Sequence, residues 1–358
     1  MLHGERNVRV LLQSRPQSFP SRENFSVVTD QVPKPGCGEV LLKTLWLSIE
    51  PYMILGMKGS APHSAKAGPD RMANLANGYL GGVEVGANMY GPTISRVIES
   101  NNRDFTVGDI VAGYSGWQEY AVDNCTTLRK LDMDGGVPVT AALGVLGIPG
   151  LTAYTGMKLI ACPKVGETVV VSAALGPVGS VVGQMARIAG ARAVGIASGA
   201  EKCRYLKDVL GFDAAVDRLA GDFPQKLAEA CPQGIDVYFE NAGGAIWWAV
   251  FPLLNEFARV PICGLVAKYS GADPELGTDR TMEVLERILL FRIKVQGLFV
   301  FDHTDLEPEF LRHVTAWVGE GKIKYREDVV DGLDKAPEAL ITVLNGKNLG
   351  KLLVRVGA

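Results

Sequence analysis

The chain has 358 residues, enough for two ordinary domains, with 47% hydrophobic residues and a formal net charge of −3. This balance gives no reason to expect a nucleic acid or another polyanion as partner. The N-terminal segment carries charges at Glu5, Arg6 and Arg9, and no apolar run of about 18 residues occurs, so we expect neither a signal peptide nor a membrane span.

The first third of the chain is rich in short β segments separated by Pro/Gly turns. From about residue 8 to 130, strands are expected within 32–52, 91–100 and 105–122. Many short strands punctuated by glycine indicate a compact barrel or sandwich. The polar segment 57–77, with many small residues, is predicted to be a mobile surface loop.

After about residue 134, apolar strands alternate with periodic helical segments. The expected strand and helix pairs are 167–173 with 177–190, 192–198 with 201–211, 234–244 with 245–254, 258–264 with 280–292, and 293–301 with 306–323. This alternation predicts a parallel sheet covered by helices on both faces. The last stretch, 326–358, contains one helix and a final strand, and its pattern alone assigns it to neither part.

Small residues gather where the first of these strands turns into its helix. Ala174, Gly176, Gly179 and Gly183 have the spacing of a dinucleotide-binding turn, with alanine in place of the first glycine. Such a turn lets backbone N–H groups approach a pyrophosphate at the positive end of a helix. Pro177 suits the first helical turn. A glycine-rich turn without a ligand is the alternative, and the strand–helix units that follow favour the nucleotide.

The tip of the next strand indicates which dinucleotide is bound. NAD-binding turns usually place a carboxylate about 20 residues past the first glycine, on the ribose 2′-hydroxyl. This strand ends in Ser198, Gly199 and Ala200, with no acid at its tip. Ser198, Lys202 and Arg218 could instead surround a 2′-phosphate, so we expect NADPH. The alternative is that Lys202 and Arg218 are solvated surface charges.

Cysteine and histidine usage gives no metal site. The six cysteines lie far apart without a Cys-x-x-Cys pair, and none of the four histidines, at positions 3, 63, 303 and 313, belongs to a Cys/His cluster. We therefore expect reduced thiols in a cytoplasmic protein and no zinc. Hydride transfer without a metal suits a carbon–carbon double bond conjugated to a carbonyl group.

Several segments resemble the zinc-independent medium-chain dehydrogenase/reductases, and most of all their alkenal double-bond reductase group, which includes prostaglandin/leukotriene reductases and curcumin reductase. They are GIPGLTAYTGMKLI (147–160), AALGPVGSVVGQ (173–184), YFENAGG (238–244), ICGLVAKY (262–269) and GKNLGK (346–351). The N-terminal LLQSRP, ENF and SIEPYM also match, so the resemblance covers nearly the whole chain.

This resemblance implies an α/β fold with two domains. A GroES-like β domain would comprise 1–133 and 320–358, and a Rossmann domain with a doubly wound parallel sheet would comprise 134–319 and bind NADPH. The substrate would lie in the cleft between them, and such proteins are commonly homodimers. The implied reaction delivers a hydride from NADPH to the β-carbon of an α,β-unsaturated ketone or aldehyde and a proton to the α-carbon.

The resemblance also assigns roles to individual residues. It gives the pyrophosphate to Gly176, Pro177, Val178 and Gly179, the 2′-phosphate to Lys202, cofactor contacts to Asn241 and Asn348, and the flanks of the nicotinamide to Phe299, Val300 and Phe301. Tyr269 would assist protonation or anchor the cofactor, and Tyr52 would line the substrate cleft. A phenol held at the carbonyl oxygen can lower the barrier by ~3 kcal/mol.

The chain departs from the family pattern near two of these residues. Glu50 and Ile54 stand where an aspartate and an arginine are usual, and Arg218 stands where many members have a tyrosine. Two other functions use the same cofactor site. One is quinone reduction by a member of the same superfamily, and the other is NADPH binding without catalysis.

Overall fold

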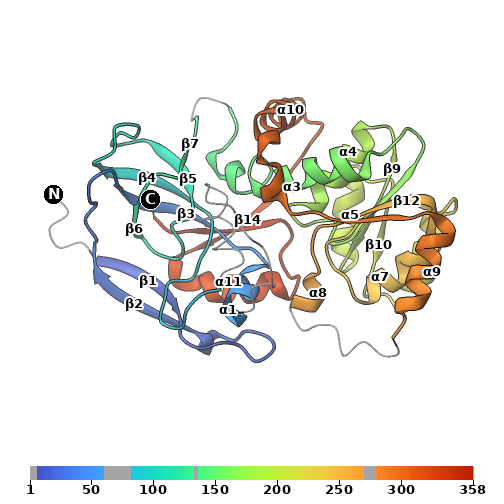
Figure 1. Ribbon diagram of the computed structural model, residues 1–358, viewed down its shortest axis with the longest axis horizontal. Helices are drawn as coiled ribbons and strands as arrows, with labels where there is room; N and C mark the ends of the chain where they lie inside the picture. The colour runs from blue at the N-terminus through green and yellow to red at the C-terminus, as the bar shows by residue number, and fades with distance from the viewer. Residues whose placement is uncertain (1–5, 60–81, 133–135, 270–278, 358) are drawn as a thin grey trace. The chain divides into compact units, whose positions relative to one another are not determined.

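The computed structural model describes residues 6–59, 82–132, 136–269 and 279–357 (Figure 1). The chain separates into two compact units, Met1–Leu143 with Glu327–Ala358 and Gly144–Arg326. The domain boundaries expected from the sequence stay a prediction. Within the described ranges, no helix combines the length and apolar character that a membrane crossing requires.

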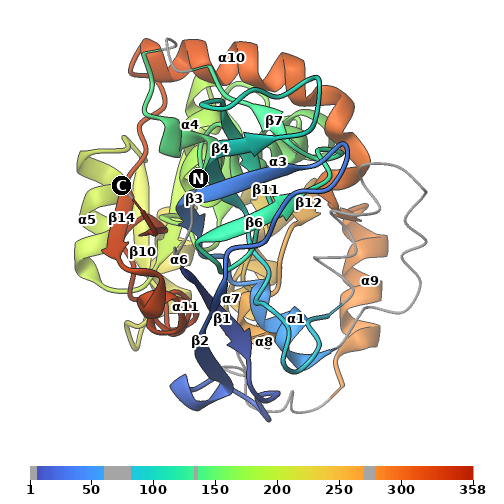
Figure 2. The same cartoon turned by 90° about the vertical axis from the view of Figure 1, so that its left-hand side faces the viewer.

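The first unit is a β domain with a few short helices. Its strands are β1 (Arg6–Leu12), β2 (Phe25–Gln31), β3 (Val40–Ser48), β4 (Thr93–Ser100), β5 (Ile110–Gly113), β6 (Tyr120–Asp123), β7 (Arg129–Lys130), β14 (Glu327–Asp331) and β15 (Lys351–Arg355). The first two form an antiparallel ribbon (Figure 2). The others form one sheet in the order β14-β15-β3-β4-β5-β7, with β6 also paired to β3. The C-terminal strand therefore belongs to this unit.

The helical elements of the first unit correct one sequence prediction. They are η1 (Arg22–Asn24), α1 (Met53–Lys58), η2 (Val139–Leu143), η6 (Leu333–Lys335) and α11 (Ala336–Leu344). The predicted loop 57–77 begins too early, because Met57 is a fully buried residue of α1. Residues 60–77 of that loop lie outside the described residues.

The second unit contains a six-stranded parallel sheet. Its strands are β8 (Thr168–Val171), β9 (Arg192–Ala197), β10 (Ala214–Asp217), β11 (Ile235–Phe239), β12 (Leu254–Ile262) and β13 (Lys294–Gly297). Their order, β10-β9-β8-β11-β12-β13, reverses direction between β8 and β11. That point is the topological switch at which open α/β sheets bind ligands beyond the carboxyl ends of their strands. The predicted α/β fold class, a β domain plus a doubly wound parallel sheet, is confirmed.

Helices cover both faces of this sheet. They are α3 (Ile148–Gly156), the π-helical turn η3 (Met157–Ala161), α4 (Gly179–Ile188), α5 (Ala200–Asp208), α6 (Phe223–Ala230), α7 (Ala245–Val250), η4 (Phe251–Leu253), α8 (Val266–Tyr269), α9 (Thr281–Phe291), η5 (Val300–Leu306) and α10 (Glu307–Gly319). One face packs on α6, α7 and α9 through residues such as Val170, Val250 and Leu227. Gly156 of α3 lies against Phe239 on the other face.

Burial explains which elements the sequence revealed. All four residues of β8 are buried, which accounts for the continuous apolar run at 169–171. The helices α3, α6 and α8 were not predicted. Eight of the nine residues of α3 are buried, so it shows no amphipathic period.

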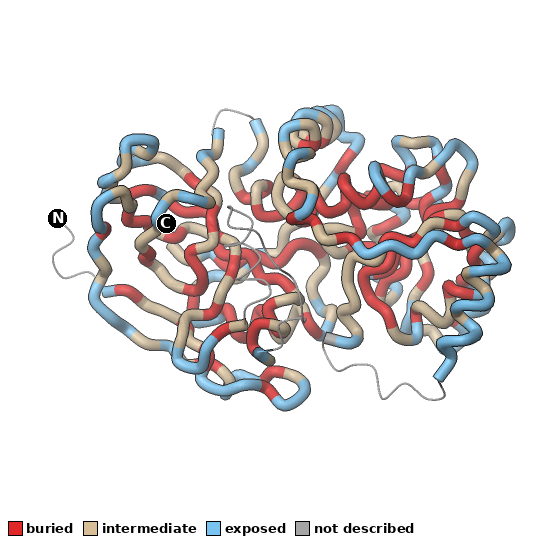
Figure 3. The backbone as a smooth tube through the Cα atoms, viewed as in Figure 1, coloured by how far each residue is buried: buried red, intermediate tan, exposed pale blue. Residues whose placement is uncertain are grey.

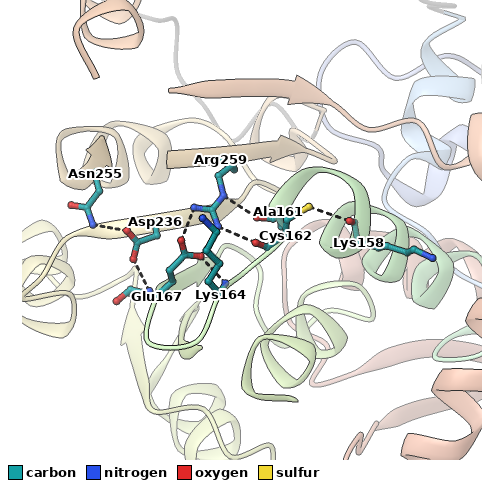
Figure 4. A network of polar contacts seen from close by, with 9 residues as sticks. Lys158, Ala161, Cys162, Lys164, Glu167, Asp236, Asn255 and Arg259 are labelled. Carbon is teal, nitrogen blue, oxygen red and sulfur yellow. Dashed lines mark hydrogen bonds and ion pairs between the residues drawn. The ribbon is translucent and has the colours of Figure 1, made fainter. Parts of the chain in front are cut away.

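A polar network fixes the amino ends of the central strands (Figure 4). Arg259 of β12 donates to Glu167 at 2.9 Å and to the carbonyl oxygens of Ala161 and Cys162. On the neighbouring strand, Asp236 accepts hydrogen bonds from the amide of Thr168, at 2.8 Å, and from the side chain of Asn255, at 2.9 Å. These contacts tie β8, β11 and β12 together at the end opposite the switch-point loops.

Candidate cofactor site

The turn between β8 and α4 is built from a short run of small residues. After β8 the chain passes through Ala173, whose φ of 48° is left-handed, and the amide of Gly176 donates to the Ala173 carbonyl at 2.9 Å. The helix then begins at Gly179, with Val178 as its N-cap residue. The first-turn amides of α4 therefore lie at the carboxyl end of a central strand, where anions bind favourably.

The three glycines of this turn are needed for different reasons. A Cβ on Gly179 would lie 2.5 Å from the carbonyl oxygen of Ala173, and one on Gly183 would lie 1.9 Å from the ring of Phe212. Packing of the helix thus excludes larger residues at both positions. A Cβ on Gly176 would meet, among the described residues within 4 Å, a single atom, the same carbonyl oxygen at 3.1 Å. Packing within the protein therefore does not explain why residue 176 is a glycine. Close approach of a ligand to its backbone would explain it.

The tips of β9 and β10 bring two predicted phosphate-binding residues together. Ser198 follows β9 and Arg218 follows β10, and the Arg218 Nε atom donates to the Ser198 hydroxyl at 2.7 Å. Asp217, the acid at this edge, accepts from the amides of Gly199, at 2.7 Å, and Leu219, at 2.9 Å. Lys202, on the adjoining α5, is half-buried. A guanidinium and a hydroxyl at the strand tips suit a phosphate better than a ribose hydroxyl.

The switch point itself holds a buried cluster in which the predicted cofactor residue Asn241 is joined by two residues that the sequence reasoning missed, Ser172 and Glu240. Ser172 follows β8, and Glu240 and Asn241 follow β11; all three are buried. The Ser172 hydroxyl donates to Glu240 at 2.9 Å and accepts from the Asn241 amide at 2.7 Å, while the Asn241 side chain donates to the Ser172 carbonyl at 2.9 Å. The sequence did offer one sign of this cluster, a glutamate directly after the apolar strand 235–239.

Four more predicted residues belong to the second unit. Three follow the carboxyl end of β13, and the side chain of the fourth is not described. Phe299, Val300 and Phe301 follow β13, and the rings of Phe299 and Phe301 meet edge to face with centroids 5.3 Å apart. Tyr269 is the last residue of α8, but its side chain lies outside the described residues.

Tyr52 and Asn348 belong to the first unit. Tyr52 precedes α1 and is half-buried. Asn348 donates to the carbonyl of Gly350 at 2.6 Å, within a loop whose Leu349 amide is held by Asp328, also at 2.6 Å. The residues that the sequence predicts for the site thus belong to both units.

The two residues that depart from the family pattern near Tyr52 are buried. Ile54 is fully buried, and Glu50 accepts from the Lys351 ammonium at 2.5 Å and from Ser48 at 2.7 Å. Burial lowers the pKa of Lys351, because desolvation disfavours its charged form. The Glu50 carboxylate is thus paired with the Lys351 ammonium group in the interior of the first unit.

No group of three or more His, Cys, Asp or Glu residues that could hold a metal ion occurs in the part of the chain that the structure describes. His3 and His63 lie outside the described residues. His313 instead shares a hydrogen bond of 2.8 Å with Tyr154, which also donates to Glu309 at 2.5 Å.

Comparison with known proteins agrees with this architecture. Residues 177–316 match the family model described as zinc-binding dehydrogenase, and residues 8–72 and 69–131 match that of the N-terminal domain of oxidoreductase. The chain is 46% identical over 353 residues to the NADPH-dependent curcumin reductase of Escherichia coli (strain K12), covering 98% of this chain and 97% of that protein. The chain belongs to the medium-chain dehydrogenase/reductase family.

Further relatives place it within the alkenal double-bond reductase group of that family. The 2-alkenal reductase (NADP(+)-dependent) of Nicotiana tabacum is 36% identical over 355 residues, covering 98% of this chain and 97% of that protein. The crystal structure of CurA in complex with NADPH from Vibrio vulnificus has a TM-score of 0.88 at 42% identity, covering 99% of this chain and 100% of that one.

Proposed function

We propose that this dehydrogenase/reductase family member is an NADPH-dependent reductase of the carbon–carbon double bond of α,β-unsaturated ketones and aldehydes. The observation that carries the proposal is the pairing of Arg218 with Ser198, at 2.7 Å, beside the glycine turn. It supports a cofactor with a 2′-phosphate, and the relatives named for curcumin and 2-alkenals support the substrate class.

The residues of the turn fit this cofactor. The Cβ position of Gly176 is open apart from one carbonyl oxygen, so a pyrophosphate could approach its backbone. Pro177, Val178 and Gly179 would complete this cradle at the N-terminus of α4. Arg218, Ser198 and Lys202 would receive the 2′-phosphate, because a guanidinium binds phosphate oxygens in a fixed fork.

The chain's own residues would orient the substrate and stabilise charge. NADPH, when bound, supplies a hydride. One N–H of the Asn241 side-chain amide is engaged by the Ser172 carbonyl, and this bond orients the amide group toward a ligand. Phe299, Val300 and Phe301 would flank the nicotinamide, and Asn348 would add a cofactor contact from the first unit.

Tyr269 and Tyr52 would act on the substrate side. Hydride addition to the β-carbon places negative charge on the carbonyl oxygen, and a hydrogen bond from the Tyr269 hydroxyl would stabilise it by ~3 kcal/mol. Tyr269 or water would then supply the proton to the α-carbon. Tyr52 would line the substrate cleft. The proposed chemistry needs no zinc, and the cytoplasmic location expected from the cysteines stays a prediction.

The test is cofactor oxidation by purified, metal-stripped protein, with NADPH and NADH in parallel, against a medium-chain 3-en-2-one, a 2-alkenal and a simple quinone. Formation of the saturated ketone with NADPH, identified by mass and NMR, supports the proposal. Turnover of the quinone alone would make the protein a quinone reductase. Tight NADPH binding without turnover of any acceptor would make it a binding protein.

We also propose that the protein is a homodimer formed through the β13 edge of the parallel sheet. All four residues of β13 are exposed, and the helix beside it is largely exposed as well (Figure 3). Met282 and Leu289 on α9 are 75% and 74% exposed, and Phe257 is 61% exposed. An open strand edge beside apolar side chains supports pairing with a second copy about a two-fold axis.

A further inference from the structure

Glu240 is a buried carboxyl group at the switch point of the parallel sheet. Its Oε1 atom accepts three hydrogen bonds, from the Ser172 hydroxyl at 2.9 Å and from the amides of Ala242 at 2.7 Å and Gly243 at 3.0 Å. Its Oε2 atom and the hydroxyl of Tyr238 are both buried. One oxygen of this side chain therefore organises the loop after β11.

Among the described residues, no positively charged side chain lowers the pKa of Glu240. Burial raises the pKa of Glu240, and it also raises those of Tyr238 and Cys263, which face the carboxyl group. A neutral carboxyl group still has an acceptor oxygen, so this side chain can hold the loop in either charge state. The hydrogen bonds that Glu240 accepts, and not its charge, therefore hold the loop after β11.

The loop after β11 in turn holds the loop after β12. Four backbone amides of the second loop donate to carbonyl groups of the first: Cys263 to Glu240 at 2.9 Å, Gly264 to Glu240 at 3.1 Å, Val266 to Asn241 at 3.3 Å, and Ala267 to Ala242 at 2.9 Å. Two of these amides begin α8, the short helix that ends at Tyr269. The position of α8 therefore depends on residues 240–242.

The first loop has an unusual backbone that needs outside support. Gly243 and Gly244 have φ values of 76° and 62°, in the left-handed region that glycine adopts readily. Glycine gives such a loop many alternative conformations, so the hydrogen bonds from Ala242 and Gly243 to Glu240 select one of them.

We propose that Glu240 is a positioning residue that sets the two loops bearing Asn241 and Tyr269. The inference rests on the proposed function in that it assigns these two residues to the cofactor and substrate. Glu240 is fully buried, and the proposal gives it no contact with the cofactor or the substrate. Its carboxyl oxygen fixes the conformation of residues 241–243, and the carbonyl groups of Asn241 and Ala242 then hold the first turn of α8.

The test compares Glu240→Met, which keeps the length of the side chain and removes both oxygens, with Glu240→Gln, which keeps one acceptor. The matched control is Asp236→Leu, which removes a carboxylate from the opposite end of the same strand, where Asp236 holds Thr168 and Asn255. Amide hydrogen exchange is measured in the ligand-free proteins, and NADPH affinity and kcat are measured separately.

We expect Glu240→Met to speed exchange at residues 263–267 by at least about tenfold, the factor that corresponds to ~1.4 kcal/mol. Glu240→Gln should stay within about 1.5-fold of the unsubstituted protein. Asp236→Leu should leave residues 263–267 unchanged. In parallel, kcat/KM should fall about tenfold in Glu240→Met and little in Glu240→Gln. If Glu240→Met does not fold, Ser172→Ala should give the same pattern at about threefold.

The inference is overturned if exchange at 263–267 is unchanged in Glu240→Met, or if it rises equally in Asp236→Leu. This readout needs no cofactor, so it can fail while the proposed function stands. If instead the exchange pattern is as expected but the unsubstituted protein neither binds nor oxidises NADPH, the loops are positioned as argued and the proposed function is wrong.

Discussion

Replacing Gly176 by alanine separates ligand contact from packing at the turn after β8. A Cβ at this position would contact one carbonyl oxygen at 3.1 Å, and Gly176 is not among the glycines with positive φ. Alanine also reduces the conformational freedom of the unfolded chain, which contributes about 0.4–1 kcal/mol to stability. These opposing effects should leave the free energy of unfolding within about 1 kcal/mol of the unsubstituted protein.

The effect on NADPH binding should be much larger. The new methyl group would stand where the pyrophosphate approaches the backbone, and loss of one hydrogen bond to a charged group costs about 1.5–3 kcal/mol. That corresponds to roughly a 10- to 150-fold weaker Kd. Unfolding in urea without ligand gives the stability, and titration of cofactor fluorescence gives the Kd.

Gly183→Ala provides the matched control for packing. Its Cβ would lie 1.9 Å from the ring of Phe212, and overpacking of this kind typically costs about 1–3 kcal/mol of stability. Gly183→Ala should thus lower the urea midpoint more than Gly176→Ala and affect NADPH binding less. If folded Gly176→Ala binds NADPH as tightly as the unsubstituted protein, the turn does not contact the pyrophosphate.

Four further outcomes follow from other parts of the structure. Arg218→Ala should raise the KM for NADPH at least about tenfold and barely change that for NADH; equal effects on both would remove Arg218 from the 2′-phosphate site. Lys351→Met leaves the buried Glu50 carboxylate without its partner and should cost about 3–5 kcal/mol in urea unfolding, part of which a second substitution, Glu50→Gln, should restore; an unchanged midpoint would contradict the buried pair. Burial raises the pKa of Glu240, so the native state loses stability as the pH rises above about 4.5 through the raised value. Glu240→Gln lacks this loss, and the unfolding free energy of the variant should gain on that of the unsubstituted protein over this range; a constant difference would refute the shift. Leu289→Glu should convert a dimer into monomers in light scattering after size exclusion, and an unchanged mass would exclude α9 from the interface.

The glycine turn and the tip of the next strand could be recognised in the sequence because the residues of each are adjacent in the chain. The spacing of Ala174, Gly176 and Gly179 and the missing acid after Ser198 are local signals, and they depend on the requirements of a single turn. The neighbouring position of Arg218 was harder to infer, because it follows the next strand. It reaches Ser198 only because β9 and β10 pair side by side.

Other elements gave no readable signal. The helix α3 is buried almost throughout, so its sequence shows no polar face from which a period could be recognised. The buried pair of Glu50 and Lys351 joins residues about 300 positions apart, and pattern reasoning treats each as a surface charge. Glu240 was passed over because its partners, Ser172 and the loop at 263–267, follow two other strands, β8 and β12.

The sequence by itself determined the alternation of strands and helices, the glycine turn and the family to which the chain belongs, because each depends on short-range spacing along the chain. Only the tertiary structure decided that β8 and β11 lie side by side, that Glu240 supports two loops at their carboxyl ends, and that Arg218 meets Ser198. The physical reason is that hydrogen bonds and burial act over a few ångströms in space, and the pairing order of a parallel sheet brings together residues that the chain keeps far apart.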